Sequence, residues 1–140
     1  MRYLGLDLGT KTLGIAISDA TRTIASAYGT LNFSENDFNS TLPKLKEIIE
    51  EYKIVKIILG LPKNMNNSIG DSGNRCLDFK QKLEEVFNLP VIMQDERLTT
   101  VEATKYMLEA DVSRKKRKKK IDGLAANIIL QTYLDKEKGI

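Results

Sequence analysis

Acidic side chains at the ends of structural elements are the residues of this chain most suited to catalysis. Asp7 lies within an alternating apolar stretch, and Asp122 precedes an apolar helical pattern. Asp95 and Glu96 follow a short apolar run. Burying an unpaired carboxylate costs several kcal/mol or raises its pKa until it takes up a proton. Asp7 in its apolar strand therefore needs a partner, and a bound cation is one such partner.

Each acid also has a purely structural interpretation. Asp7 could close a turn at a strand end, and Asp122 could stabilise the first turn of a helix through the helix dipole. Asp95 or Glu96 could pair with Arg97. Successive strand side chains point to opposite faces, so only one of Asp95 and Glu96 is expected to face a common cluster. A cluster of three carboxylates repels itself unless cations bind.

The residues that are absent narrow the chemistry further. The chain has no histidine and one cysteine, Cys76, which falls in an apolar helical pattern and is interpreted as a buried structural thiol. Histidine-dependent nucleophiles, histidine-bound zinc and disulfides within the chain are excluded. Clustered carboxylates instead suit Mg²⁺ or Mn²⁺. Two such ions about 4 Å apart can activate a water and stabilise the leaving oxygen of a phosphodiester.

The apolar pattern predicts an α/β fold, in which a mixed sheet is covered by helices within one domain, residues 1–140. Alternation predicts three antiparallel strands, at 2–8, 12–18 and 23–30. The later elements alternate: helix 39–52, strand 54–61, a helix ending at 87, a strand from 90 to 95–96, and helices 99–109 and 121–134. If strands one and four are neighbours, the buried strands end at one edge, and the last helix brings Asp122 over it.

Seven consecutive basic residues lie directly before Asp122: Arg114, Lys115, Lys116, Arg117, Lys118, Lys119 and Lys120. The chain carries a formal charge of +3, yet acidic residues outnumber basic ones outside this run. Such a run could be a solvated loop or a nuclear-localisation signal. Its place beside Asp122 favours a third interpretation, a clamp for the phosphates of a nucleic acid.

Other segments are less informative. The stretch Gly60–Gly73 is rich in Gly, Asn and Ser, and it predicts a loop that either contacts phosphate or only connects. No apolar run is long enough to span a bilayer and no signal peptide is evident, so we expect a cytoplasmic protein without membrane contact.

Four motifs together resemble the YqgF (RuvX) family of bacterial nucleases over nearly the whole chain. They are Gly5-Leu6-Asp7-Leu8-Gly9-Thr10-Lys11 with Gly14, Gly60-Leu61-Pro62 with Met65 and Ser68, Asp95-Glu96-Arg97-Leu98-Thr99-Thr100, and Ile121-Asp122 with Ala125-Ala126. The resemblance implies an RNase H-like fold with a five-stranded mixed sheet. It also implies a metal-dependent centre of Asp7, Glu96 and Asp122, which selects Glu96 over Asp95.

The family is described both as a nuclease that matures the 5′ end of precursor 16S rRNA and as a Holliday junction resolvase. Asn66-Asn67 stands where the family usually has Asp-Gly, which puts an acidic role of that loop in doubt. We expect Lys11, Arg97 and the run 114–120 to hold the nucleic-acid strand. Resolving a four-way junction requires two matched cuts and a dimer. No dimer stripe is evident in the sequence, so a monomer acting on RNA is favoured.

Two other classes of function compete. Leu6-Asp7-Leu8-Gly9-Thr10 also looks like the phosphate loop of actin-like ATPases and sugar kinases, but those proteins have a second lobe and more than twice this length. A non-catalytic nucleic-acid-binding module would use the basic run alone. Substituting the three acids would then leave binding unchanged and abolish no activity.

Overall fold

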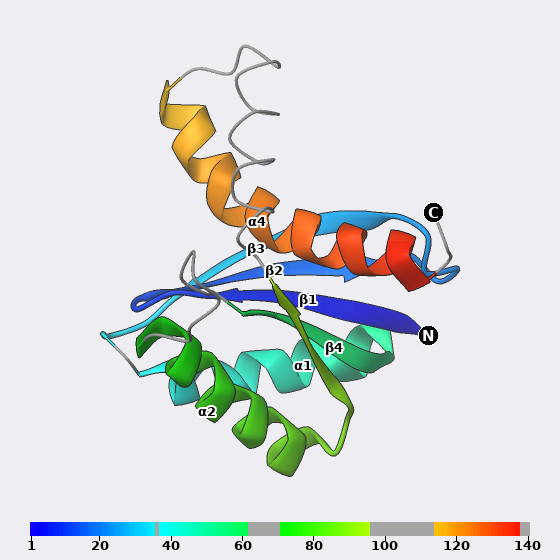
Figure 1. Ribbon diagram of the computed structural model, residues 1–140, viewed down its shortest axis with the longest axis horizontal. Coiled ribbons are helices and arrows are strands. Elements are labelled where there is room, and N and C mark those ends of the chain that lie inside the picture. Colours follow the sequence, from blue (N-terminus) through cyan, green and yellow to red (C-terminus); the bar gives the residue numbers. More distant parts are fainter. Residues whose placement is uncertain (36, 62–70, 96–113, 138–140) are drawn as a thin grey trace.

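The computed structural model describes residues 1–35, 37–61, 71–95 and 114–137, and at 71–72, 95 and 114–124 it describes the backbone. The described strands form one sheet in the order β3-β2-β1-β4-β5 (Figure 1). The first three pair antiparallel, and β4 and β5 are parallel to β1. The predicted mixed sheet is confirmed.

The antiparallel part consists of β1 (Arg2–Leu8), β2 (Thr12–Ser18) and β3 (Ala25–Asn32). Their alternating side chains divide between two cores, one on each face of the sheet. The third strand begins two residues later than predicted, because the Asp19 carboxylate accepts hydrogen bonds from the backbone N–H groups of Thr23 (2.8 Å) and Ile24 (3.2 Å). These bonds hold both residues in the turn rather than in the strand.

The parallel part consists of β4 (Ile54–Leu61) and β5 (Val91–Asp95). The register pairs Leu6 with Leu59, and Leu61 with Asp95. The carboxyl ends of β1, β4 and β5 therefore lie at one edge of the sheet, as the sequence predicted.

Helices cover both faces (Figure 1). The 3₁₀ helix η1 (Phe38–Thr41), α1 (Leu42–Tyr52) and α2 (Asp71–Phe87) pack on one face, where Leu45, Phe79 and Leu83 are fully buried. The predicted helix from 39 thus begins as a 3₁₀ turn, and Pro43 lies in the first turn of α1, where its missing N–H costs nothing. Cys76 is buried in the same core, as expected.

The long helix α4 (Arg114–Glu137) covers the other face. It begins seven residues before the predicted start at Ile121, because Lys and Arg are good helix formers and the run contains no breaker. The basic run is therefore the start of α4 and not a separate segment. Asp122 is in the third turn, where the helix dipole no longer explains it.

Other predicted elements lie partly or wholly outside the described residues. Of the predicted loop 60–73, Gly60 and Leu61 end β4 and Asp71 begins α2, while 62–70 lie outside the described residues. The predicted helix 99–109 also lies outside them. Within the described part of the chain, no helix is long and apolar enough to cross a membrane.

Candidate functional site

Asp7 lies near the carboxyl end of β1, on the face covered by α4. Leu4, Leu6 and Leu8 point into the opposite core, so alternation turns Asp7 to the side of Tyr3 and Gly5. Asp7 is half-buried between two buried neighbours, Leu6 and Leu8. Its polar side chain is thus held at a defined place on an otherwise apolar strand.

Glycine flanks Asp7 on both sides of β1. The register pairs Asp7 with Gly14 of β2. On the other side Leu6 pairs with Leu59, so Gly60 of β4 is next in line with Asp7. Glycine weakens a strand interior and often marks a place where another group approaches the backbone. Gly14 and Gly60 therefore place no side chain of their own beside Asp7 on this face of the sheet.

The row through Asp7 extends across the whole sheet. Gly14 pairs with Thr30 of β3, and Gly60 pairs with Gln94 of β5. Asp95 pairs with Leu61, whose side chain belongs to the core under α1 and α2. In the alternation of the sheet, the register position of Asp95 therefore corresponds to the opposite face from that of Asp7.

The helix α4 packs directly on the backbone of β1. A Cβ placed on Gly5 would lie 2.7 Å from Cβ of Leu130 and 3.1 Å from the carbonyl oxygen of Ala126. Both distances are shorter than ordinary van der Waals contact. Gly5 is therefore required for this helix to lie so close to the strand, a role that the sequence motif around it does not reveal.

The carboxyl-terminal end of α4 is anchored by a polar cluster at the start of β1. The Tyr3 hydroxyl donates to Glu137 Oε1 (3.0 Å), and Lys56 Nζ donates to the Tyr133 hydroxyl (3.1 Å) and to Glu137 Oε2 (3.3 Å). The Lys56 ammonium also lies 4.9 Å from the Tyr3 ring centroid and 5.4 Å from that of Tyr133. These contacts hold the carboxyl end of α4 over the start of β1.

The charges in this cluster stabilise one another. Burial lowers the pKa of Lys56, but its hydrogen bonds to Tyr133 and Glu137 outweigh burial and hold that pKa above its usual value. Burial likewise raises the pKa of Glu137, and bonds from Tyr3 and Lys56 reverse the effect and lower it. The periodic pattern of α4 gave no sign of this cluster, because its members come from three separate elements.

A second anchor ties α4 to β3. The backbone N–H of Ala25 donates to Gln131 Oε1 (2.8 Å), and Gln131 Nε2 donates to the carbonyl oxygen of Thr23 (2.9 Å). Together with the contact at Gly5, these bonds define the course of α4 from its carboxyl end back to Ala126.

The remaining predicted site residues are placed only in part. Lys11 is exposed in the turn between β1 and β2, where its carbonyl oxygen accepts from the N–H of Phe33 (2.9 Å). The run Arg114–Lys120 forms the first turns of α4, which rise away from the sheet (Figure 1). Asp122 lies one turn before Ala126. Glu96 and Arg97 lie outside the described residues, and within those described no three acids, cysteines or histidines form a metal site.

Comparison with known proteins identifies the family. Residues 1–136 match the RuvX family, described as Holliday junction resolvase. A protein of Caldanaerobacter subterraneus named "Putative pre-16S rRNA nuclease" is 50% identical over 139 residues, 99% of each chain. A Bacillus subtilis protein of the same name is 51% identical over 135 residues, 96% of this chain and 98% of its own.

Solved structures share the fold at low identity. RuvC of T. thermophilus, bound to a Holliday junction substrate, superposes with a TM-score of 0.61 at 13% identity, covering 99% of this chain and 96% of that one. The fowlpox virus resolvase, in complex with Holliday junction DNA, gives 0.56 at 15% identity, with 98% and 99% covered. The expected RNase H-like architecture is confirmed, and the family and relatives support the expected nuclease activity, that of a hydrolase acting on nucleic acid. The family match spans residues 1–136, and the Caldanaerobacter and Bacillus proteins share about half of their residues with this chain. The chain therefore belongs to the RuvX family.

Proposed function

We propose that this chain is a metal-dependent endonuclease that matures the 5′ end of precursor 16S rRNA, with Asp7, Glu96 and Asp122 as ligands of Mg²⁺ or Mn²⁺. The observation that carries the site is the half-buried Asp7, which lies between Gly14 and Gly60 on the face covered by α4. The names of two relatives that match nearly the whole chain support the RNA substrate.

The course of α4 supports Asp122 as a partner of Asp7. Tyr3 contacts α4 at 133 and 137, whereas Gly5 contacts it at 126 and 130, so the helix runs opposite to β1. The step from Gly5 to Asp7 covers about 6.8 Å of strand, which equals about four to five residues of helix. Counted from Ala126 toward the start of the helix, that step leads to Asp122, a position on the same face of the helix as Ala126.

The sheet register supports Glu96 rather than Asp95. Asp95 takes the register position opposite Leu61, whose side chain lies in the core on the face away from Asp7. Successive side chains of an extended chain point to opposite faces of a sheet. Glu96 is therefore the acid of this pair expected on the side of Asp7.

The available donors fit a hard cation. Asp7 contributes carboxylate oxygens, the chain has no histidine, and its one cysteine is buried in the other core. When bound, Mg²⁺ or Mn²⁺ supplies a nucleophilic water and stabilises charge on the phosphate. Gly14 and Gly60 add no side chain beside Asp7 that would block the approach of a phosphodiester. The packing of α4 on Gly5 keeps the helix that carries Asp122 close to β1.

The start of α4 supports a polyanionic substrate. The pairs 114/118, 115/119 and 116/120 bring like charges one turn apart, which destabilises a helix. Cations at a helix amino terminus are also disfavoured by the helix dipole. Bound phosphates would offset both costs. We propose that this run, with Lys11 and Arg97, holds the RNA strand.

A cleavage assay with two substrates tests this function. A 16S precursor with an extended 5′ end and a four-way DNA junction are each incubated with the protein in Mg²⁺ or Mn²⁺, and with a chelator as control. We expect specific cutting of the RNA, abolished by the chelator. Failure to cut either substrate with any metal would refute the nuclease proposal.

The family description favours a second candidate, resolution of Holliday junctions. That function requires two symmetric cuts and therefore a two-fold dimer. We propose a monomer, so sedimentation of the protein with and without junction DNA separates the candidates. A junction-bound dimer that makes paired cuts would replace the RNA proposal.

A further inference from the structure

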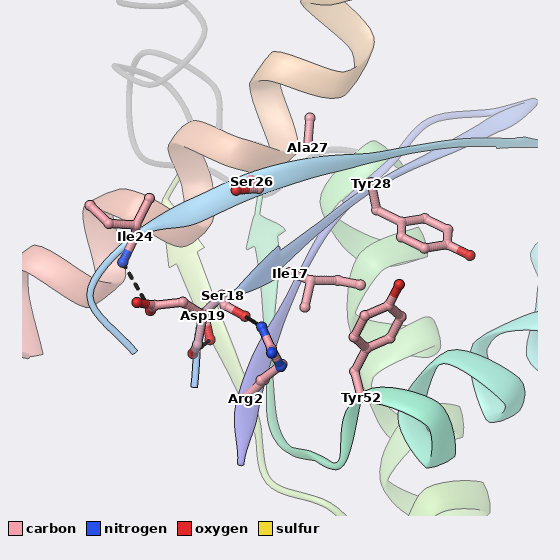
Figure 2. A pocket seen from close by; sticks show the side chains of 9 residues that line it. All are labelled: Arg2, Ile17, Ser18, Asp19, Ile24, Ser26, Ala27, Tyr28 and Tyr52. Atoms are coloured by element: carbon pink, nitrogen blue, oxygen red, sulfur yellow. Dashed lines mark hydrogen bonds between the residues drawn. The ribbon is translucent and has the colours of Figure 1, made fainter. Parts of the chain in front are cut away.

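A cavity lies at the opposite end of β1 from Asp7. It has a volume of about 260 Å³ and lies between the start of β1, the end of β2, β3 and the last residue of α1 (Figure 2). Its main walls are Arg2, Ile17, Tyr28 and Tyr52, of which Ile17 belongs to the core under α1 and α2. The cavity is therefore on the face of the sheet away from α4.

Two tyrosines and a guanidinium line this cavity, and we call the three residues the tyrosine slot. The rings of Tyr28 and Tyr52 meet edge to face, with centroids 6.1 Å apart and planes at 85°. The Arg2 guanidinium lies 5.9 Å from the Tyr52 ring centroid. Its Nη1 donates to the carbonyl oxygen of Ser18 (3.0 Å), which fixes the group while leaving its other donors available.

An irregularity of β3 aims Tyr28 at this place. Ala16 pairs with Ala27 and Ile15 pairs with Gly29, so the register skips Tyr28 as a bulge. A bulge at a sheet edge re-aims a side chain, and it also discourages edge-to-edge aggregation. The second role requires an irregular backbone but not an aromatic residue. Yet the side chain here is a tyrosine that is 39% exposed.

The chemistry of the walls favours a flat, uncharged ring system. Asp19 also borders the cavity, but its carboxylate already accepts bonds from Thr21 Oγ1 and from the backbone of Thr23 and Ile24. Aromatic faces and an arginine plane are the surfaces on which unpaired bases stack in RNA-binding proteins. The cavity has room for one such ring system and not for a duplex.

We infer that the tyrosine slot binds one unstacked base of single-stranded RNA next to the segment that is cut, an inference that rests on the proposed RNA substrate. A path joins the two places: Asp7 pairs with Gly14 and Gly14 with Thr30 of the edge strand. That row spans about 10 Å, and Tyr28 lies about 7 Å further along β3. A strand that leaves Asp7 over Gly14 reaches the slot around this edge within a few nucleotides.

The test is binding of a fluorescein-labelled, single-stranded RNA oligonucleotide, measured by anisotropy with Tyr28→Ala and Tyr28→Phe. Stacking on one aromatic ring is worth about 5- to 150-fold in affinity, so Tyr28→Ala weakens binding by a factor in this range while Tyr28→Phe keeps most of it. The slope of log affinity against log salt stays unchanged, because every phosphate keeps its cationic partner. Val86→Ala, which trims an exposed apolar residue of α2, is the matched control and binds like wild type.

Each outcome bears on the slot independently of the catalytic site. Equal affinity of Tyr28→Ala and wild type refutes the inference, even where the protein still cleaves RNA. The inference is also refuted if Val86→Ala weakens binding as much as Tyr28→Ala does, or if the wild-type protein does not bind the oligonucleotide. If instead an added peptide rich in arginine competes at Tyr28 and RNA does not, the occupant is a protein and the inference is wrong. Thermal unfolding of each variant, unchanged from wild type, excludes loss of fold as the cause.

Discussion

Replacing Gly5 by alanine should displace α4 from the sheet. The new Cβ would lie 2.7 Å from Cβ of Leu130, whereas carbon atoms in contact are separated by about 3.5–4.0 Å, so the helix must move by about 1 Å. Overpacking of this kind costs about 1–3 kcal/mol. Alanine recovers about 0.5–1 kcal/mol of strand stability relative to glycine. We therefore expect a net loss of about 1 kcal/mol, and at most about 2.5 kcal/mol, in the free energy of unfolding.

The displaced helix carries Asp122, so activity should fall more than stability. A shift of about 1 Å in a catalytic group can cost about 100-fold in rate. Urea unfolding followed by circular dichroism measures stability, and single-turnover cleavage of the RNA precursor measures activity under conditions where the variant is folded. Ile48→Val, a trimmed core residue of α1 expected to lose about 0.5–1.5 kcal/mol, controls for stability alone. Gly5→Ala that cleaves as fast as Ile48→Val would refute this reasoning.

Two further predictions concern the charges of the chain. Hydrogen bonds from Thr21, Thr23 and Ile24 lower the pKa of Asp19 from 3.8 to about 2, so its stabilising contribution is complete above about pH 4 and is lost as the pH falls toward 2. Acid unfolding of Asp19→Asn should lack this component, and a profile identical to wild type would contradict the role of the turn. Replacing several of Lys115–Lys120 by Gln should reduce the slope of log affinity for RNA against log salt by about 0.7 for each phosphate that is no longer neutralised. An unchanged slope would make the run a solvated helix end.

The sheet could be predicted from the sequence because its signals are local. The alternation in β1 and β2 and the unbroken apolar run of β4 place strands within a residue of their observed bounds. The start of β3 depended on the Asp19 carboxylate, whose bonds to the turn no periodicity records. The predicted start of α4 was wrong because the basic run was placed before the last helix rather than in it, although its residue types favour a helix.

The sequence singles out candidate site residues by their types, but it does not reveal what surrounds them. Asp7 could be singled out because a carboxylate interrupts an apolar strand. The roles of Gly5 and Gly60 depend on which element packs against or beside them, and this follows only from the register and from the path of α4. The bonds of Lys56 to Tyr133 and Glu137 join residues about 80 positions apart, a relation that spacing alone does not encode.

The central claim is that Asp7 is a metal ligand of a nuclease, and the rate of cleavage by Asp7→Asn tests it most directly. The RNA precursor is cut under single-turnover conditions in Mg²⁺ or Mn²⁺, with Asp78→Asn, an exposed acid of α2, as the matched control. We predict that Asp7→Asn binds the RNA but makes no detectable cut, while Asp78→Asn cuts at the wild-type rate. Cleavage by Asp7→Asn at a rate comparable to wild type would contradict the claim.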